Sequence, residues 1–242
     1  MIVGLVHPGE MGAALGDALG GAGHEVLWAS DGRSEATRER ARAFRDVGTL
    51  PTLAAQSEMI LSVCPPHAAL AVARATAGAS VLYVDANAIS PDRAREVAAL
   101  HPRFVDGGIV GSPPRTAGTT RLYLSGEEAP AVAALFAGTV VDARLVVDAS
   151  ALKMTYAAWS KGTAALLLAI RDVARASGVW DALEAEWRES APELFPRLQS
   201  AERSAAAKGW RWIGEMEEIA DTFVAAGQPE GFHRAAAEVY RG

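Results

Sequence analysis

The chain has 242 residues, half of them hydrophobic, which is enough for one large domain or two modest ones. Its formal net charge is −6 and its basic residues form no run or stripe, so nucleic acid is not expected as a partner. With one cysteine and five scattered histidines, the sequence predicts neither a disulfide framework nor a metal site. The longest apolar stretch, residues 164–170, is far shorter than the ~20 residues that span a bilayer, so we expect a cytoplasmic protein without a membrane anchor.

Up to about residue 147, short β-branched runs alternate with segments of helical length, a pattern typical of βα units in a mainly parallel sheet. The predicted strands span residues 2–6, 25–29, 59–64, 80–85, 103–110, 120–125 and 140–142. The predicted helices begin near residues 9, 33, 65, 90 and 127. The first part of the chain therefore predicts a doubly wound α/β domain over residues 1–147.

After Asp148 the β-branched runs stop, and the composition predicts helices to the end, with breaks at Gly178, Pro192, Gly209 and residues 227–229. The first of these helices, residues 150–176, would be ~40 Å long at about 1.5 Å per residue. The rest of this half is too short to cover it alone, so we expect a second chain against it and a homodimer. Residues 148–242 are thus predicted to form an all-helical domain for substrate binding and dimerisation.

The first strand, turn and helix contain the segment HPGEMG, which reads like a dinucleotide-binding glycine loop with His7 in place of the first glycine. The helix N-terminus offers free N–H groups and a positive dipole end to a pyrophosphate, and its two glycines allow close approach and close packing. A plain turn between strand and helix is the alternative. We predict a Rossmann-type domain in which the cofactor contacts His7, Pro8, Gly9, Glu10, Met11 and Gly12.

The segment GHEVLWASDGRS follows, and the end of its strand is where an acidic residue would bind the ribose of NAD and an arginine would accommodate the extra phosphate of NADP. Ser30, Arg33 and Ser34 together suit a phosphate group, whereas Asp31 favours NAD. A helix N-cap beside a surface arginine is the alternative interpretation. We predict NADPH in preference to NAD.

Seven segments, in order, resemble the β-hydroxyacid dehydrogenase superfamily, which includes 6-phosphogluconate dehydrogenase and the imine reductases. They are GLVHPGEMG, GHEVLWAS, SVCPP, VDANAISP, VDGGIVGSPPRTAGTTRLYLSG, ALKMTYAAWSKG and the C-terminal run from KGWRW to AEVY. The last resembles a subgroup of phosphogluconate-dehydrogenase-like proteins whose C-terminal domain has no known function. The resemblance implies a nicotinamide dinucleotide cofactor and a small-molecule substrate.

The resemblance also assigns site residues. Cys64, Pro65 and Asn87 match positions that flank the nicotinamide, although a lone cysteine at a strand end is more often a small buried hydrophobic residue. Lys153 matches the family's catalytic lysine, and helical spacing places Tyr156 and Ser160 on its face. Without the resemblance, this lysine would be interpreted as a surface residue.

Several positions depart from the family pattern. Ala157 stands where the family has a substrate-binding asparagine, Ser160 replaces the glutamate of 6-phosphogluconate dehydrogenase, and Val110 and Ser112 alter the glycine-rich substrate loop. Phosphogluconate is therefore not the expected substrate. Gly111, Ser112, Arg115 and Ser160 are the predicted substrate-binding residues, with Arg115 either clamping an anion or exposed to solvent.

Two further groups have alternative interpretations. Five tryptophans could line an apolar cleft or pack between helices, namely Trp159, Trp180, Trp187, Trp210 and Trp212. Glu215, Glu217 and Glu218 are expected on a solvated helix face.

The sequence predicts an NADPH-dependent oxidoreductase that interconverts a small carbonyl or imine with its alcohol or amine, with Lys153 and Tyr156 as catalytic residues. The alternative is a dinucleotide-binding protein, regulatory or structural, that has lost hydride transfer. The sequence leaves the substrate and the direction of the reaction open.

Overall fold

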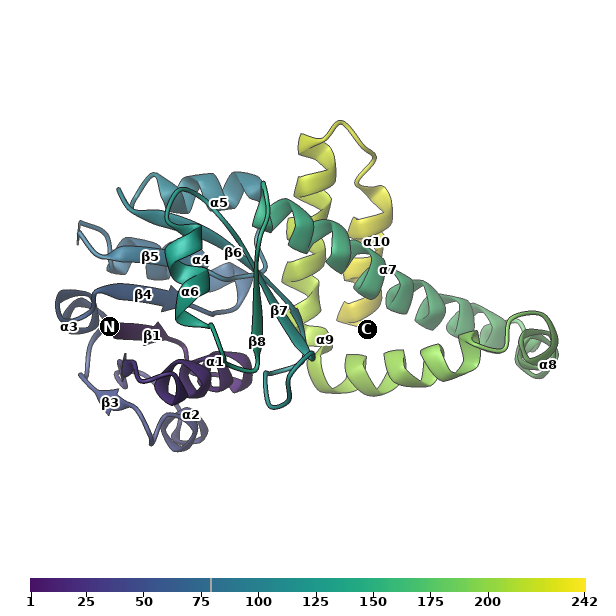
Figure 1. Cartoon of the computed structure of the whole chain (residues 1–242). Helices are drawn as coiled ribbons and strands as arrows, with labels where there is room; N and C mark the ends of the chain where they lie inside the picture. Colours follow the sequence, from purple (N-terminus) through teal and green to yellow (C-terminus); the bar gives the residue numbers. More distant parts are fainter. Residues whose placement is uncertain (79) are drawn as a thin grey trace. The chain divides into compact units, whose positions relative to one another are not determined.

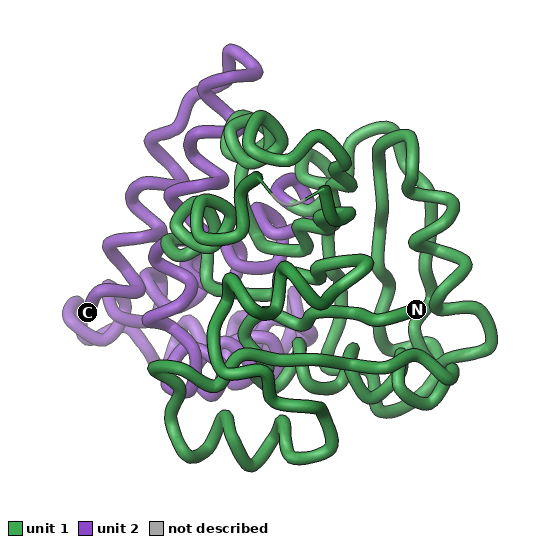
Figure 2. Tube along the Cα trace, turned by 90° about the vertical axis from the view of Figure 1, so that its left-hand side faces the viewer, with its two compact units in different colours: residues 1–153 green, residues 154–242 purple. Residues whose placement is uncertain are grey.

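The computed structural model describes residues 1–78 and 80–242, which divide into two compact units, residues 1–153 and 154–242 (Figure 2). The boundary falls inside a helix and lies six residues beyond the predicted domain boundary at residue 147. As a result, the first turn of that helix, including Lys153, is part of unit 1.

Unit 1 is built on an eight-stranded sheet with the order β3-β2-β1-β4-β5-β6-β7-β8 (Figure 1). Its strands are β1 Ile2–Val6, β2 Glu25–Trp28, β3 Arg45–Asp46, β4 Met59–Ser62, β5 Leu82–Asp85, β6 Phe104–Gly111, β7 Thr120–Ser125 and β8 Val141–Leu145. Pairing is parallel throughout except between β6 and β7. The predicted mainly parallel sheet is confirmed.

Helices cover both faces of this sheet. They are α1 Glu10–Gly21, α2 Glu35–Arg40, α3 Leu50–Gln56, α4 Pro66–Ala75, α5 Pro91–Ala98 and α6 Ala129–Leu135. Neighbouring strand residues point to opposite faces, so Met59 and Leu61 join α1 and α6 in one buried cluster, while Ile60 joins α3, α4 and α5 in another. The doubly wound fold is therefore confirmed as well.

Two elements of unit 1 were not predicted. Strand β3 has only two residues, both exposed, which is too short for a periodic signal. Helix α3 carries a proline in its first turn and is capped by the Thr49 side chain, which accepts a hydrogen bond from Thr52 N–H.

Unit 2 is entirely helical. Helix α7 (Ala149–Ala176) begins in unit 1 and supplies the first helix of unit 2, followed by α8 (Trp180–Ser190), α9 (Leu194–Ala225) and α10 (Gly231–Arg241). An aromatic contact connects α9 and α10, because the ring centroids of Trp212 and Tyr240 lie 5.1 Å apart. None of the described helices is long and apolar enough to cross a bilayer.

The break predicted at Gly209 is wrong, because α9 runs unbroken through this residue. Gly209 is buried within α9, near the carbonyl of Tyr240 on α10, so tertiary packing outweighs the weak helix propensity of glycine. The helix does change direction between its light-green and yellow-green parts (Figure 1).

Candidate functional site

The carboxyl ends of β1 and β4 lie side by side at the centre of the sheet, and the chain leaves them in opposite directions along the strand order. In an open α/β sheet, ligands bind in the crevice at such a switch point. The loops after β1, β2, β4, β5 and β6 all emerge at this edge. They contain the predicted cofactor residues 7–12, 30–34, 64–65 and 87, and the predicted substrate residues Gly111 to Arg115.

The glycine loop keeps its form although His7 replaces the first glycine. His7 adopts the left-handed conformation, with φ of 59°, and it is the only non-glycine residue with positive φ in the part of the chain described. Its carbonyl accepts a hydrogen bond from Gly9 N–H at 2.7 Å. A Cβ on Gly12 would lie 2.6 Å from the same carbonyl oxygen, whereas a Cβ on Gly9 would meet nothing within 4 Å. Gly12 thus allows the helix to pack, and Gly9 faces open space.

His7 and Arg33 bring basic groups to this edge. Burial lowers the pKa of His7 to about 4, and the nearby charges of Arg33 and His67 act in the same direction. Its imidazole is therefore neutral at pH 7. His7 Nδ1 and Arg33 Nε are buried and have no hydrogen-bond partner among the described residues. Buried polar nitrogens without partners are rare in folded proteins, and both of these lie where the resemblance implies a nucleotide.

At the end of β2, Ser30 is buried and its N–H donates to Asp46 Oδ1 at 3.2 Å. Arg38 Nη2 donates to the Ser30 carbonyl at 2.9 Å, so a second guanidinium lies beside the predicted phosphate position. Ser34 caps α2 by accepting a hydrogen bond from Thr37 N–H at 3.4 Å. Sequence reasoning missed Asp46, because β3 gave no signal of its own, and it missed Arg38, whose bond to the Ser30 carbonyl depends on how α2 folds back on the end of β2.

Asn87 connects the loops that follow β4 and β5. Its Oδ1 accepts a hydrogen bond from Cys64 N–H at 2.5 Å, and its Nδ2 donates to Ser62 Oγ at 3.1 Å. Its own N–H donates to Asp85 Oδ1 at 2.9 Å. Asn87 is only 2% exposed, so these bonds fix the Cys64–Pro65 segment from the buried side. Burial raises the pKa of Cys64 to about 12, so the group is a thiol and not a nucleophilic thiolate.

Lys153 lies against β6. Its Nζ donates a hydrogen bond to the Ile109 carbonyl at 2.8 Å, three residues before Ser112. This approach depends on Gly108, where a Cβ would lie 2.7 Å from Ala149 O and 2.9 Å from Lys153 Cβ. On the β5 side, a Cβ on Gly107 would lie 2.8 Å from Asp85 O. The two glycines let β6 pack closely against both β5 and α7.

The start of α7 is fixed by side chains from three segments. The first three N–H groups of the helix donate to Ser125 Oγ (3.0 Å), Asp106 Oδ2 (2.8 Å) and Asp148 Oδ1 (2.7 Å). Ser150 Oγ also donates to Asp106 Oδ1 at 2.6 Å. Helix N-terminal N–H groups have no partner within the helix, so these oxygens satisfy them. They fix where α7 begins, and therefore the position of Lys153 near its start. Sequence reasoning missed Asp106 and Ser150.

The predicted substrate residues fall in two places. A hollow of about 340 Å³ in unit 1 is lined by Ser112 and Arg115 together with Glu10, Pro113, Thr116 and Thr119. Gly111 precedes this lining at φ of 118°, where a Cβ would collide with Thr119 O. Tyr156 and Ser160 belong to unit 2, where Ser160 lines a different cavity. Ala157 is fully buried.

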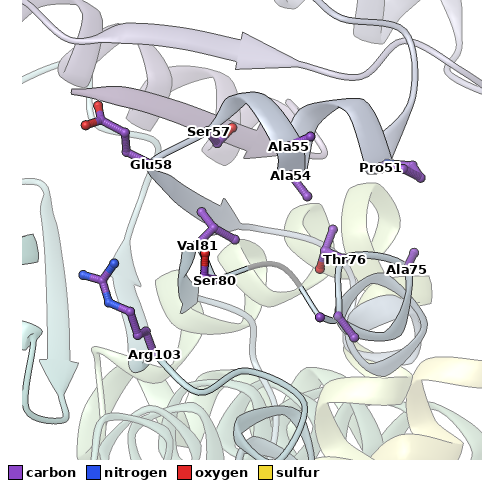
Figure 3. A pocket seen from close by; sticks show the side chains of 12 residues that line it. Pro51, Ala54, Ala55, Ser57, Glu58, Ala75, Thr76, Ser80, Val81 and Arg103 are labelled. Atoms are coloured by element: carbon purple, nitrogen blue, oxygen red, sulfur yellow. The ribbon is translucent and has the colours of Figure 1, made fainter.

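Another hollow, of about 720 Å³, lies at the opposite, amino-terminal edge of the sheet (Figure 3). Glu58 and Arg103 mark one end of it, and they come just before β4 and β6. It is therefore separate from the loops that carry the predicted cofactor residues. Among the described residues, no group of three His, Cys, Asp or Glu side chains is arranged to hold a metal ion.

Unit 1 fits a dinucleotide in three respects. The loop after β1 leads into the N-terminus of α1, the space in front of Gly9 is open, and buried nitrogens of His7 and Arg33 face this edge without partners. When bound, the pyrophosphate would contact residues 7–12, and Arg33 would lie beside the adenosine part.

The sequence matches two domain families. Residues 1–89 match a Rossmann-like domain, and residues 174–242 match a domain of unknown function, DUF1932. No curated protein matches the chain. The chain therefore combines a Rossmann-like domain with a DUF1932 domain.

Solved structures resemble the chain over its whole length. The conserved protein MTH1747, of unknown function and structurally similar to 3-hydroxyacid dehydrogenases, is 28% identical, with a TM-score of 0.71 and coverage of 100% of this chain and 97% of that one. A 3-hydroxyisobutyrate dehydrogenase from Salmonella typhimurium is 16% identical, with a TM-score of 0.71 and coverage of 100% and 93%. A reductive aminase from Aspergillus terreus, solved with NADPH, is 18% identical, with a TM-score of 0.60 and coverage of 99% and 92%. The resemblance inferred from the sequence is confirmed at the level of fold and domain order.

Proposed function

We propose that the protein is an NADPH-dependent oxidoreductase that interconverts a small carbonyl or imine with its alcohol or amine. The observation that carries this proposal is the position of Lys153 Nζ, 2.8 Å from the Ile109 carbonyl near the carboxyl end of β6. This is the sheet edge at which the glycine loop and the Ser112–Arg115 hollow also lie. The solved dehydrogenases and the reductive aminase support the proposal through their shared fold.

The bound dinucleotide would supply or accept the hydride. Lys153 would stabilise and protonate the oxygen or nitrogen that gains charge when the substrate is reduced, and would take the proton back in the reverse direction. Its bond to Ile109 O fixes the amine, so little reorganisation is needed for proton transfer. Tyr156, three residues further along α7, is the proposed second catalytic residue.

The preference for NADPH rests on two guanidinium groups near the end of β2. Arg33 has a buried Nε without a partner among the described residues, and Arg38 donates to the Ser30 carbonyl. Arginines bind phosphate with directional, charge-assisted hydrogen bonds. Asp31 and Asp46 oppose this preference, because a carboxylate in that place would bind the unphosphorylated ribose of NAD.

For the substrate, we propose the hollow beside the glycine loop. Ser112 and Arg115 line it, and Arg115 would pair with an anionic group of the substrate while Gly111 and Ser112 contact the reacting end. Ser160 stays a predicted substrate residue. The buried thiol of Cys64 is compatible with the reducing cytoplasm in which we expect the protein to act.

A turnover panel separates this enzyme from the alternative, a dinucleotide-binding protein without hydride transfer. Purified protein is mixed with NADPH and, in turn, keto acids, aldehydes and cyclic imines, and the loss of reduced nicotinamide is followed. We expect oxidation with at least one class of carbonyl or imine. Tight NADPH binding without oxidation across the panel would favour the alternative.

We also propose that the protein is a homodimer. Exposed apolar residues follow one stripe of α7 at intervals of seven residues, namely Trp159, Leu166 and Val173, which are 62%, 45% and 66% exposed. Such spacing is typical of helices that pack on another helix, and a second copy of α7 is the occupant we propose. Leu166→Glu should convert a dimer to a monomer by light scattering, whereas Val224→Glu, at an exposed position of α9, should not. A monomeric wild-type protein would contradict this.

A further inference from the structure

Unit 2 contains a cavity of about 370 Å³ between α7 and α9, and its lining shares no residue with the hollow lined by Ser112 and Arg115. A volume of this size is within the range of about 300–1,000 Å³ found for small-molecule sites. Its walls come from Trp159, Ser160, Lys161, Thr163, Ala164 and Leu167 on α7, and from Arg197, Ser200, Ala201, Ser204 and Trp212 on α9. All of these residues lie within unit 2.

The charged residues that line the cavity are both basic. They are Lys161 and Arg197, and no aspartate or glutamate is among the described lining residues, although the chain as a whole has a net charge of −6. Each cation lies over an indole ring: Lys161 Nζ is 5.9 Å from the Trp212 centroid, and Arg197 Cζ is 6.0 Å from that of Trp159. Cation–π contacts of this kind hold the charges at the cavity wall. The lining therefore favours an anionic ligand.

Lys161 and Arg197 differ in how their charge is balanced. Lys161 Nζ pairs with Glu215 Oε2 at 2.8 Å, and both side chains are nearly buried, which corrects the expectation that Glu215 faces solvent. Tyr240 Oη donates to the Lys161 carbonyl at 2.5 Å and helps to fix this turn of α7. Arg197 forms no ion pair among the described residues. One positive charge at the cavity is therefore left unbalanced, which fits a monoanion better than a doubly charged phosphate.

The rest of the cavity lining suits the apolar part of an organic ligand. Two indole rings, Ala164, Leu167 and Ala201 offer apolar surface, and the hydroxyls of Ser200 and Ser204 lie one turn apart on α9. A carboxylate bound by Arg197 would place its hydrocarbon part between these rings. We propose that this cavity is a binding site for a small organic monocarboxylate with an apolar body. The proposal rests on unit 2 alone and does not depend on hydride transfer in unit 1.

The test uses the full-length protein without nucleotide, with benzoate, phenylpyruvate and hexanoate as probes and benzamide as an uncharged control. Calorimetric titration should detect saturable binding of at least one carboxylate and none of benzamide. Arg197→Gln should weaken that binding by about tenfold or more, because a hydrogen bond to a charged group is lost. Arg203→Gln is the matched control, since it makes the same charge change on α9 at a residue outside the cavity lining, and it should bind as wild type.

Tryptophan fluorescence then locates the ligand. Binding should change the emission, and Trp159→Phe or Trp212→Phe should remove most of that change, whereas Trp210→Phe, on α9 but outside the lining, should keep it. The proposal is overturned if none of the three carboxylates binds, if benzamide binds equally, or if Arg197→Gln binds as wild type. Because nucleotide is absent, these outcomes say nothing against the proposed oxidoreductase, and an inactive enzyme would leave them unchanged.

Discussion

Gly108 is the residue on which the position of Lys153 depends. A methyl group there would lie 2.7 Å from Ala149 O and 2.9 Å from Lys153 Cβ, and a backbone oxygen cannot move away without shifting α7. We expect Gly108→Ala to lower the free energy of unfolding by about 1–3 kcal/mol and to reduce kcat if turnover is found. Urea denaturation measures the first effect.

The matched control is Gly214→Ala on α9, where an added Cβ would meet nothing within 4 Å. Replacing an interior helical glycine by alanine should raise stability by up to about 1 kcal/mol. Equal destabilisation by both substitutions would show that close packing at Gly108 is not the cause.

Asp85 should make stability depend on pH. Burial raises the pKa of this carboxyl to about 7, so between about pH 4 and 7 the unfolded chain releases a proton that the folded chain keeps. The contribution of Asp85 to stability is complete below about pH 4 and is lost as the pH rises through 7. His7 acts in the opposite direction, since its lowered pKa costs stability as the pH falls from about 6.5 to 4.

Comparison with Asp85→Asn isolates the carboxyl group. The variant should gain stability relative to wild type as the pH rises from about 4 to 8, measured by urea denaturation at several pH values. A difference between the two proteins that does not vary with pH would contradict the raised pKa.

For single residues, the sequence indicated which of them lie in the loops at the carboxyl edge of the sheet, but it did not indicate their side-chain contacts. The glycine loop was recognisable from its two remaining glycines. His7 can stand in place of the first glycine because histidine is among the residues that tolerate the left-handed conformation it adopts. Asn87 was predicted at the cofactor edge, but its bonds to Cys64, Ser62 and Asp85 depend on neighbouring strands and could not be read from spacing. Glu215 was predicted in solvent because its buried partner, Lys161, lies 54 residues away in the sequence.

Helix α7 carries the proposed chemistry, and its start is set by oxygen atoms from other segments. Asp106 accepts hydrogen bonds from both the N–H and the Oγ of Ser150. Asp106→Asn would place an amide N–H against one of these donors, so we expect a loss of about 1–3 kcal/mol in unfolding free energy. If turnover is found, kcat should fall while the Kd for NADPH stays within a few-fold of wild type.

The control for this substitution is Asp148→Asn, because asparagine caps helices as well as aspartate does and the bond from Ala151 N–H to Asp148 Oδ1 is exposed to solvent. It should remain close to wild type in both stability and kcat. If Asp148→Asn were as harmful as Asp106→Asn, the buried network would not be what positions the helix.

At the scale of elements, periodicity predicted the long strands and α7, whose bounds differ from the prediction by one residue. The failures have physical causes. Strand β3 is recruited by pairing with β2 through two exposed residues, and α9 continues through Gly209 because it packs on α10. Both depend on contacts between distant segments.

At the scale of the whole molecule, cofactor binding should appear as stabilisation. A ligand that binds only the folded state raises the unfolding temperature, by an amount that grows with its concentration relative to Kd. NADPH should therefore raise the Tm more than NADH at equal concentration, and Arg33→Ala should reduce the NADPH shift toward the NADH value. Equal shifts for the two nucleotides in wild-type protein would contradict the assigned role of Arg33.

The arrangement of domains was predictable because a βα pattern followed by uninterrupted helix is a strong signal over many residues. The cavity between α7 and α9 was not, since Lys161, Arg197 and Trp212 come together only after α9 packs on α7. From the sequence, the five tryptophans could either line a cleft or pack between helices. Trp159 and Trp212 line the cavity, whereas Trp187 is buried and Trp210 is exposed.

Single-turnover oxidation of bound NADPH tests the central claim most directly. Wild-type protein and Lys153→Met, each saturated with NADPH, are mixed rapidly with the carbonyl or imine on which wild type is fastest, and the decay of reduced nicotinamide is recorded. If Lys153 is the proton donor, the variant should bind NADPH with unchanged Kd and react about 100-fold or more slowly. A rate for Lys153→Met within a few-fold of wild type would contradict the account.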